Sequence, residues 1–300
     1  MKHHSAYLTT TTTLGGRGSR MLCLSVLLSL WLTGCATSQG PVLLRWNPDA
    51  AEKIAYNTLV DAEPAPQYHI KQHGFEIARS ESLRAEAKKR LLSIPLPLAP
   101  LETTFVKQPL GLRVTTLVTE TPQTVDENAP LKVAEQFPPK TSRIRTDIDT
   151  TGELASFYYY DKVKVLLALF FKLPTAPVKV GDTWQVPLHI LQIGESFTPH
   201  SASRINQVRL EGISTSEEGE RIAHLFYTIA EKVEGEYVHI GRKKRTITPI
   251  NGIGSYIGYG EFYIDRGYWK HLIFQQIVDR GKHPLGSEKK VFALELIKEP

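Results

Sequence analysis

Apolar and polar positions alternate over short segments through the second half of the chain. After residue 141, runs rich in Val, Ile, Thr and aromatic residues follow one another, separated by Gly, Asn, Asp and Pro. This alternation predicts β-strands, and the short connections favour an antiparallel meander over βαβ units. The expected strands are Thr183–Gln192, Ala202–Glu211, Arg221–Glu234, Tyr237–Ile240, Thr246–Pro249, Gly254–Asp265, Tyr268–Asp279 and Lys290–Lys298.

The segment before these strands predicts a hairpin followed by a helix. Residues 142–160 read as two strands joined by a turn, in which Asp149 can bond back to the backbone and Gly152 tolerates a positive φ. Asp161 is then placed as an N-cap, and apolar residues at helical spacing continue to Leu173, before a proline. We expect this helix to cover one side of the sheet. Its buried face comprises Val163, Leu166, Leu167 and Phe170.

Residues 42–100 are harder to interpret. In residues 42–60, Asn47 followed by Pro and Asp can begin a helix, or Leu43–Trp46 and Lys53–Val60 can form the strands of a hairpin. We favour the hairpin. The fold of residues 47–100 otherwise stays open.

One helix and one strand stand out in that region. Ser82–Ser93 has the composition of a helix, and its apolar residues Leu83, Ala87 and Leu91 share one face. Prolines in residues 94–100 end regular structure, and a second proline-rich loop covers residues 119–140. Between the two, the Val- and Thr-rich segment Gly111–Glu120 predicts a strand.

The N-terminus carries an export signal. Met21–Leu32 is an uncharged apolar run preceded by Arg17 and Arg20, and a helix of that length reaches only ~18 Å, short of the ~30 Å of a membrane core. A basic flank before a short apolar run is typical of a secretory signal peptide. The run ends in Leu32-Thr33-Gly34-Cys35, which resembles the bacterial lipobox. The alternative is a buried helix in which Cys35 is incidental.

The lipobox resemblance implies cleavage between Gly34 and Cys35 and a lipid on the Cys35 sulfur. Residues 1–34 would be removed, residues 35–41 would be the lipidated tether, and residues 42–300 would form a β-rich periplasmic domain, with residues 42–140 less clearly organised than 141–300. Because Ala36, and not Asp, follows the cysteine, the resemblance implies an outer-membrane anchor facing the periplasm.

Removing the leader changes the composition. It takes Lys2, Arg17 and Arg20 and no acidic residue, so the 36 basic residues fall by three to 33, against 31 acidic ones. A net charge of +2 gives no ground for nucleic-acid binding. Cys23 leaves with the leader and Cys35 would be lipidated, so no thiol remains for a disulfide, a zinc cluster or a nucleophile.

Two motifs of the body resemble a known family. Pro177–Trp184 (PVKVGDTW) and Gly260–Phe274 (GEFYIDRGYWKHLIF) are similar to motifs of uncharacterised, β-rich bacterial envelope lipoproteins. The resemblance covers about Leu43–Glu299 and is weak before Thr141. It implies a mainly β (α+β) fold, a large curved antiparallel sheet or unclosed barrel with one or two packed helices. That architecture is also similar to periplasmic lipoprotein carriers, and neither motif is catalytic.

Metal-ligand and cofactor patterns are weak, and we predict no metal and no cofactor. His69 and His73 have helical i, i+4 spacing, but Ile70 stands where a metalloprotease has its glutamate, and on an extended segment the two rings would lie roughly 13 Å apart. The remaining histidines of the mature chain show no ligand spacing: His189, His200, His224, His239, His271 and His283.

Other motifs also favour structural roles. Asn251–Gly260 lacks the third glycine of a dinucleotide loop, and its glycines predict a bulge or coiling of the sheet. Arg242–Arg245 (RKKR) reads as a solvated hairpin tip, with contact to anionic phosphates as the functional option. Glu261 and Asp265 would lie about 13 Å apart along one strand, beyond the spacing of paired glycosidic carboxylates.

Three functions fit these observations. The first is a non-enzymatic, lipid-anchored envelope protein with a binding or assembly role. The second is a carrier or chaperone for a hydrophobic ligand such as a lipid or lipoprotein. The third is a hydrolase of unrecognised type, which requires clustered acids and histidines.

A hydrophobic groove is the candidate site of the second function. On one predicted strand Tyr256, Phe262 and two glycines share a face, and Tyr268 and Phe274 can join it from the next strand. These four aromatic residues either line a groove that accepts an acyl chain or an extended partner segment, or pack as ordinary core.

Overall fold

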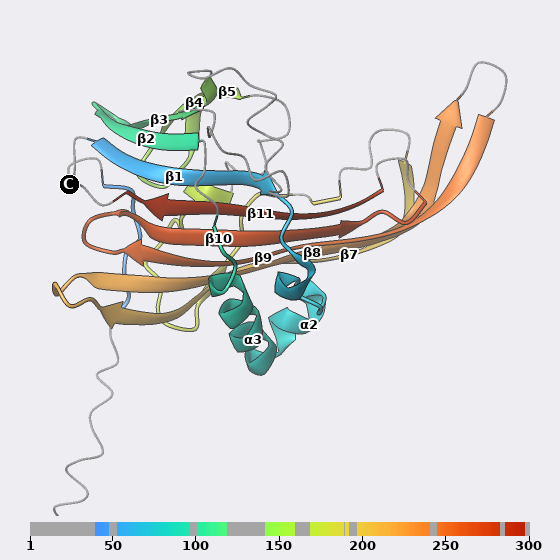
Figure 1. The fold of residues 1–300 in the computed structure, drawn as a ribbon, viewed down its shortest axis with the longest axis horizontal. Coiled ribbons are helices and arrows are strands. Elements are labelled where there is room, and N and C mark those ends of the chain that lie inside the picture. Colours follow the sequence, from blue (N-terminus) through green and yellow to red (C-terminus); the bar gives the residue numbers. More distant parts are fainter. Residues whose placement is uncertain are drawn as a thin grey trace, which may run out of the picture. The chain divides into compact units, whose positions relative to one another are not determined.

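One large antiparallel sheet, open at both edges, organises the domain. The computed structural model describes residues 40–47, 53–96, 101–118, 142–159, 169–188, 190–191, 197–240, 245–282 and 286–297. All of these belong to one compact unit, residues 40–300. The eleven strands run in the order β5-β4-β3-β2-β1-β11-β10-β9-β8-β7-β6 (Figure 1). The expected fold class, mainly β with an unclosed antiparallel sheet and few helices, is therefore confirmed.

Strand lengths differ greatly across this sheet. The strands are β1 Lys53–Ala62, β2 Leu101–Gln108, β3 Gly111–Val118, β4 Ser142–Ile148, β5 Leu154–Tyr159, β6 Thr183–Trp184, β7 Phe197–Thr215, β8 Arg221–Ile240, β9 Arg245–Tyr263, β10 Tyr268–Asp279 and β11 Ser287–Leu296. Three of them, β7 to β9, have 19 or 20 residues, so this part of the sheet reaches well beyond the rest.

The first and last strands meet in the middle of the sheet. β1 pairs with β11 from Tyr56↔Leu296 to Ala62↔Val291. From this seam, β2 to β5 extend to one edge and β10 to β6 extend to the other. The chain between β5 and β6 therefore has to return from one edge of the sheet to the opposite edge.

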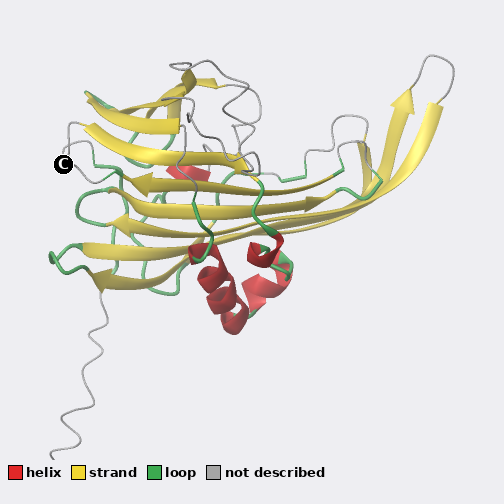
Figure 2. Cartoon of the chain, in the orientation of Figure 1, coloured by secondary structure: helices red, strands yellow, loops and turns green. Residues whose placement is uncertain are grey.

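Two helices cover one face of the sheet, which we call the helical face (Figure 2). They are α2, Gly74–Arg79, and α3, Glu81–Leu92, after a 3-10 turn at Pro66–Tyr68. The Ser80 hydroxyl caps α3 by accepting the Leu83 N–H, as expected of an N-cap serine. A Cβ on Gly74 would lie 2.8 Å from the Ala230 Cβ, so α2 rests directly on the strands.

The opposite face, which we call the core face, carries the larger apolar cluster. Segments without long regular structure cover it, namely residues 42–46, 169–173, 186–188 and Ile190. The indole N–H of Trp46 donates to the Phe171 carbonyl at 2.8 Å, and that of Trp269 donates to the Phe170 carbonyl at 2.7 Å. Two buried hydrogen bonds thus hold residues 170–171 against the core face. Losing either indole would leave a buried carbonyl without that partner.

The hairpin expected in residues 42–60 is wrong in part. Lys53–Val60 does form a strand, but β1 pairs with β2 and β11. Residues 43–46 are extended, yet Trp46 bonds to Thr150 and the neighbouring Val42 bridges to Val178. Val42, Leu44 and Trp46 of this segment are buried in the core-face cluster, which accounts for its position outside the sheet.

Several expected strand limits also need correction. Arg221–Glu234 and Tyr237–Ile240 are one strand, because long-range pairing continues through Gly235. Thr246–Pro249 and the strand predicted from Gly254 are also one strand, which ends at Tyr263 and not at Asp265. Thr183–Gln192 is a strand only at Thr183–Trp184.

Beyond Trp184, side chains and not a neighbouring strand bond the backbone groups. The Asn206 amide bonds both backbone groups of Val186, and the Glu231 carboxylate accepts the N–H groups of Ile190 and Leu191 at 2.8 and 2.9 Å. The alternating apolar pattern here reflects burial against the core face and not membership of the sheet.

Other expectations are confirmed. β10 has the predicted limits, α3 covers the predicted helix, and β3 forms within Gly111–Glu120. At the predicted turn, Asp149 Oδ1 accepts the backbone N–H groups of Thr151 and Glu153, and Gly152 has a φ of 76°. Of the helix expected over residues 161–173, only residues 169–173 lie within the described residues. Residues 169–171 are helical, so the helix ends at Phe171, two residues before the predicted limit at Leu173.

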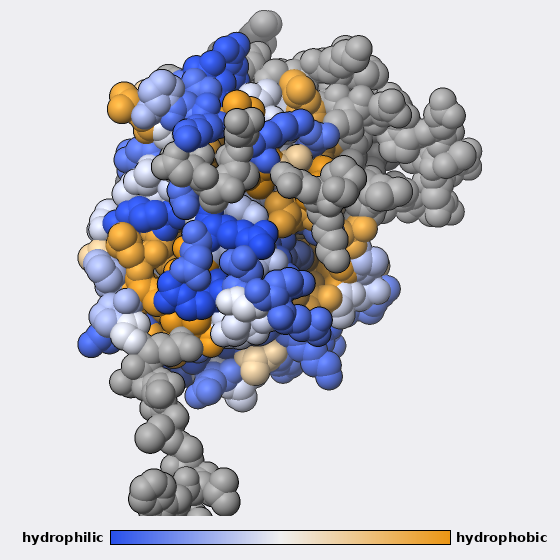
Figure 3. All heavy atoms as spheres, turned by 90° about the vertical axis from the view of Figure 1, so that its left-hand side faces the viewer, coloured by the Kyte–Doolittle hydropathy of each residue, from blue (hydrophilic) through white to orange (hydrophobic). Residues whose placement is uncertain are grey.

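No helix in the described part of the chain has both the length and the apolar character needed to cross a membrane. The end of the sheet with the β7–β8 and β9–β10 turns shows hydrophilic patches interrupted by apolar ones (Figure 3). Ion pairs between Arg221 and Asp265 and between Arg266 and Glu220 join these two turns.

Candidate functional site

The four aromatic residues predicted to line a groove are buried on the core face. Tyr256, Phe262, Tyr268 and Phe274 are 4%, 0%, 7% and 0% exposed. Phe274 lies over Gly258 and meets the ring of Tyr227 at 4.8 Å between centroids. Trp269 and Leu272 fill the space above Gly260. The structure therefore favours ordinary packing for these side chains.

A polar cluster on the helical face is the most developed chemical arrangement among the described residues. We call it the helical-face cluster, and it comprises Ser214 on β7, His224 on β8, Tyr259 and Glu261 on β9 and Lys270 on β10. Strand register brings these residues together, because His224 pairs with Glu261, and His271, next to Lys270, pairs with Glu261 from the other side.

Continuous hydrogen bonds join the five side chains. Ser214 Oγ lies 2.7 Å from His224 Nε2, and His224 Nδ1 lies 2.6 Å from the Tyr259 hydroxyl. Tyr259 donates to Glu261 Oε1 at 3.1 Å, and Lys270 donates to Glu261 Oε2 at 2.8 Å. All four contacts lie within, or about 0.1 Å outside, the ordinary hydrogen-bond distances.

The donor and acceptor properties of these side chains fix the direction of each hydrogen bond in the helical-face cluster. An ionised Glu261 can only accept, so the single hydroxyl proton of Tyr259 points to it. The Tyr259 oxygen must then accept a proton from His224, which places the N–H of a neutral imidazole on Nδ1. Nε2 is left with a lone pair, and the Ser214 hydroxyl donates to it.

The electrostatics agree with this arrangement. Burial lowers the pKa of His224 below its usual value, against the opposing charge of Glu261, so the ring is neutral at neutral pH. Although burial raises the pKa of Glu261, its hydrogen bond to Lys270 and the Lys270 charge bring it below the ordinary value. Burial, and then the charge of Glu261, raises the pKa of Tyr259, which therefore stays protonated.

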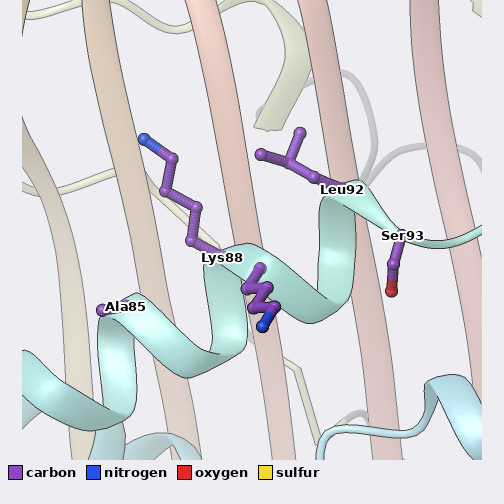
Figure 4. A pocket seen from close by; sticks show the side chains of 5 residues that line it. Ala85, Lys88, Leu92 and Ser93 are labelled. Carbon is purple, nitrogen blue, oxygen red and sulfur yellow. The ribbon is translucent and has the colours of Figure 1, made fainter.

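Helix α3 borders the cluster. The Lys88 ammonium lies 4.1 Å from the centre of the Tyr259 ring, a cation–π contact. A shallow hollow of about 400 Å³ lies along the outer side of α3. Figure 4 shows Lys88 and Leu92 extending from the same side of the helix, with Ser93 on the other side. The hollow is lined by Ala85, Lys88, Lys89, Leu92 and Ser93.

A two-stranded extension is the second notable feature. The pairing of β10 with β9 ends at Ile253, and that of β7 with β8 ends at Tyr237. β8 and β9 continue together to Ile240↔Arg245. We call residues 235–250 the β8–β9 arm. Residues 235–237 still pair with β7, and beyond them the described residues of β8 and β9 extend past the neighbouring strands in Figure 1. Its Ile247 side chain is half exposed.

The remaining sequence candidates do not converge on one site. His69 Nε2 contacts the Pro64 carbonyl at 2.9 Å, whereas His73 precedes the first turn of α2. No group of three metal-ligating side chains occurs among the described residues. Gly34 and Cys35 lie outside the described residues, as do Arg242 to Lys244.

Sequence reasoning missed the helical-face cluster. His224 was counted among histidines without ligand spacing, and Glu261 was compared only with a carboxylate on its own strand. Ser214 and Tyr259 carried no signal by themselves. The available signal was the hairpin of β8 and β9, whose register places His224 opposite Glu261.

Comparisons with known proteins add no assignment. No protein-family model matches this sequence, and no curated protein matches it.

Proposed function

We propose that this protein is a lipid-anchored bacterial envelope protein with a binding or assembly role, exercised through the β8–β9 arm. The proposal combines the signal and lipobox pattern with one structural observation, the extension of β8 and β9 beyond the neighbouring strands. The sequence that connects these two strands is basic. The partner that fits is an anionic, phosphate-bearing surface of the envelope.

The packed core face supports an external binding surface. Where the chain is described, its own segments at residues 42–46, 169–173, 186–188 and Ile190 fill that face. A carrier of a hydrophobic ligand needs an unfilled apolar concavity, and the side chains predicted to line one are buried among each other. Contact with a partner therefore falls to outer surfaces.

The basic residues of the β8–β9 arm indicate the class of partner. Residues 235–250 contain four basic residues, Arg242 to Arg245, and a single acidic residue, Glu236. Phosphate groups of membranes and of envelope polymers carry the complementary charge. The tether of six residues between Cys35 and Val42 spans at most roughly 20 Å, so an anchored domain stays close to such a surface.

Sedimentation with lipid vesicles tests this proposal. Residues 36–300, without the anchor, should bind vesicles containing phosphatidylglycerol more strongly than vesicles of phosphatidylcholine, and salt should weaken the binding. The double substitution Lys243→Glu and Lys244→Glu should abolish the preference. The matched control, Lys179→Glu with Lys282→Glu, makes the same charge change at exposed lysines outside the arm.

Two results would contradict the proposal. Equal loss of binding in both double variants would show that net charge, and not the arm, is responsible. A lipid retained by the purified domain in native mass spectrometry would favour the carrier function instead.

A further inference from the structure

The helical-face cluster ends at an exposed hydroxyl, and we infer that Ser214 is a base-activated nucleophile. It would accept the acyl group of small carboxylic esters, with His224 as general base. This inference uses neither the arm nor the anchor, and it departs from the non-enzymatic role expected from the sequence. The helical-face cluster instead has what the sequence analysis requires of a hydrolase, an acid and a histidine close together.

The first requirement of such a site is contact between nucleophile and base. Ser214 Oγ lies 2.7 Å from His224 Nε2, within the reach of proton transfer. Because the direction of the hydrogen bonds leaves the lone pair on Nε2, the ring can accept the Ser214 proton without first changing its tautomer. Ser214 itself is exposed, so a substrate can approach it.

The second requirement is a group that orients the base and stabilises its charge. The Tyr259 hydroxyl holds Nδ1 at 2.6 Å, and the two rings are stacked with centroids 6.2 Å apart. Glu261 Oε1 lies 3.8 Å from His224 Nδ1, so the carboxylate charge stabilises the ring when His224 becomes protonated. Lys270 fixes the other oxygen of that carboxylate. Nucleophile, base and orienting groups therefore follow one another as in known covalent catalysts.

The chemistry balances without any further reactant except water. Ser214 Oγ attacks the ester carbonyl carbon while its proton passes to His224 Nε2, the bond to the alcohol oxygen breaks, and His224 returns the proton to that oxygen. The products are an acyl-serine and an alcohol. Water then attacks the acyl-serine with His224 again as base, and release of the carboxylic acid restores the Ser214 hydroxyl.

The surroundings indicate the substrate class. Ser214 is exposed. Two residues away, a Cβ placed on Gly212 would have His224 Cδ2 as its nearest atom, at 4.0 Å. Short acyl groups therefore have room beside Ser214. The charges of Lys88 and Lys270 act on His224. Because Lys270 is paired with Glu261, the positive charge that favours a negatively charged ester comes from Lys88.

Covalent labelling tests the inference directly. A fluorophosphonate probe, whose phosphorus is attacked by an activated serine with loss of fluoride, should add once to the full-length protein, at Ser214. Ser214→Ala should remove the label, whereas Ser201→Ala should retain it. Ser201 is the matched control, because it is an exposed serine on the same strand that bonds to a carboxylate, Glu234.

Variants of the base distinguish activation from mere exposure. His224→Gln should slow labelling by about 100-fold or more, the usual contribution of a general base. Tyr259→Phe keeps the ring and removes only the hydroxyl, and should slow labelling about tenfold. It serves as the second variant if His224→Gln fails to fold, which circular dichroism would show.

The pH profile adds an independent readout. The labelling rate should rise with pH and level off, with a midpoint below the ordinary histidine value of about 6.5. A label that persists in Ser214→Ala, a rate unaffected by both His224→Gln and Tyr259→Phe, or no labelling of the unmodified protein would each overturn the inference. None of these results bears on vesicle binding by the arm.

Discussion

Filling the space above Gly258 should destabilise the protein through Phe274. A Cβ at Gly258 would overlap ring carbons Cδ1 and Cε1 of Phe274, well inside the ~3.5 Å at which carbon atoms make contact. Phe274 is fully buried between Tyr227 and Phe170, with ring centroids 4.8 and 6.1 Å away, so it has little room to retreat. Overpacking of this kind costs about 1–3 kcal/mol.

A double-mutant cycle measures the effect. Gly258→Ala should cost about 1–3 kcal/mol by overpacking and Phe274→Ala about 3–5 kcal/mol by leaving a cavity. In the double variant the added methyl enters the vacated space. Its cost should therefore fall below the sum of the single costs by an interaction energy of about 1–3 kcal/mol. Urea unfolding at 25 °C gives the free energies.

Gly212→Ala is the matched control. The nearest atom to a Cβ there would be 4.0 Å away, so the substitution fits. Its effect should lie between zero and about 1 kcal/mol of stabilisation, because alanine restricts the unfolded chain. If Gly258→Ala costs no more than Gly212→Ala, or if the cycle is additive, Phe274 does not rest on Gly258. That result would favour the groove predicted from the sequence over ordinary packing.

Three further outcomes are expected. Cys35→Ser should abolish palmitate labelling and membrane fractionation, and continued labelling would contradict the lipobox assignment. Leu167→Ala should cost about 2–5 kcal/mol if residues 161–173 form the expected buried helix, whereas a change below about 0.5 kcal/mol in chemical denaturation would place Leu167 on the surface. Burial raises the pKa of Asp149, but the hydrogen bonds from Thr151 and Glu153 outweigh it and bring the pKa below its usual value. Stability from Asp149 is therefore present above its unfolded pKa of about 3.9 and lost as the pH falls through the lower folded pKa. Asp149→Asn should weaken that acid dependence, and unchanged acid unfolding curves would refute it.

Local sequence patterns were enough to predict an element where residues within that element determine its limits. Asp149 and Gly152 define a turn by bonds within five residues. The apolar spacing of α3 is an equally local signal. Strands β8 and β9 were divided at Gly235 and Pro249, because these residues usually end strands. In the structure Gly235 pairs with Ile250 and Glu236 pairs with Pro249, so continuous pairing along the neighbour outweighs the local preference.

Other elements depended on contacts that no local pattern contains. β2, Leu101–Gln108, follows a proline-rich segment and was not predicted, yet it pairs with β1 and β3 over its length. Residues 185–191 resemble a strand, but Asn206 and Glu231 hold their backbone. Whether aromatic residues line a groove or fill a core likewise depends on segments distant in sequence.

The candidate site shows the same division. The sequence supplies His224 and Glu261, but only the register of β8 against β9 places them opposite each other, and only β7 brings Ser214 to the ring. A shift of one residue in that register would turn His224 to the other face. Chemistry that spans three strands is therefore encoded in pairing and not in spacing along the chain.

The seam between β1 and β11 has a consequence for how the chain is made. Tyr56 pairs with Leu296, so the middle of the sheet closes only after the chain has been synthesised through β11. Closing a loop of that size is an entropically costly, slow event. Until it happens, two separate hairpin arrays each expose an unpaired inner edge, the kind of edge that recruits other chains. A product that terminates before Ser287 would never lose those edges. Early termination near the C-terminus should therefore yield an aggregating protein and not a slightly shortened one.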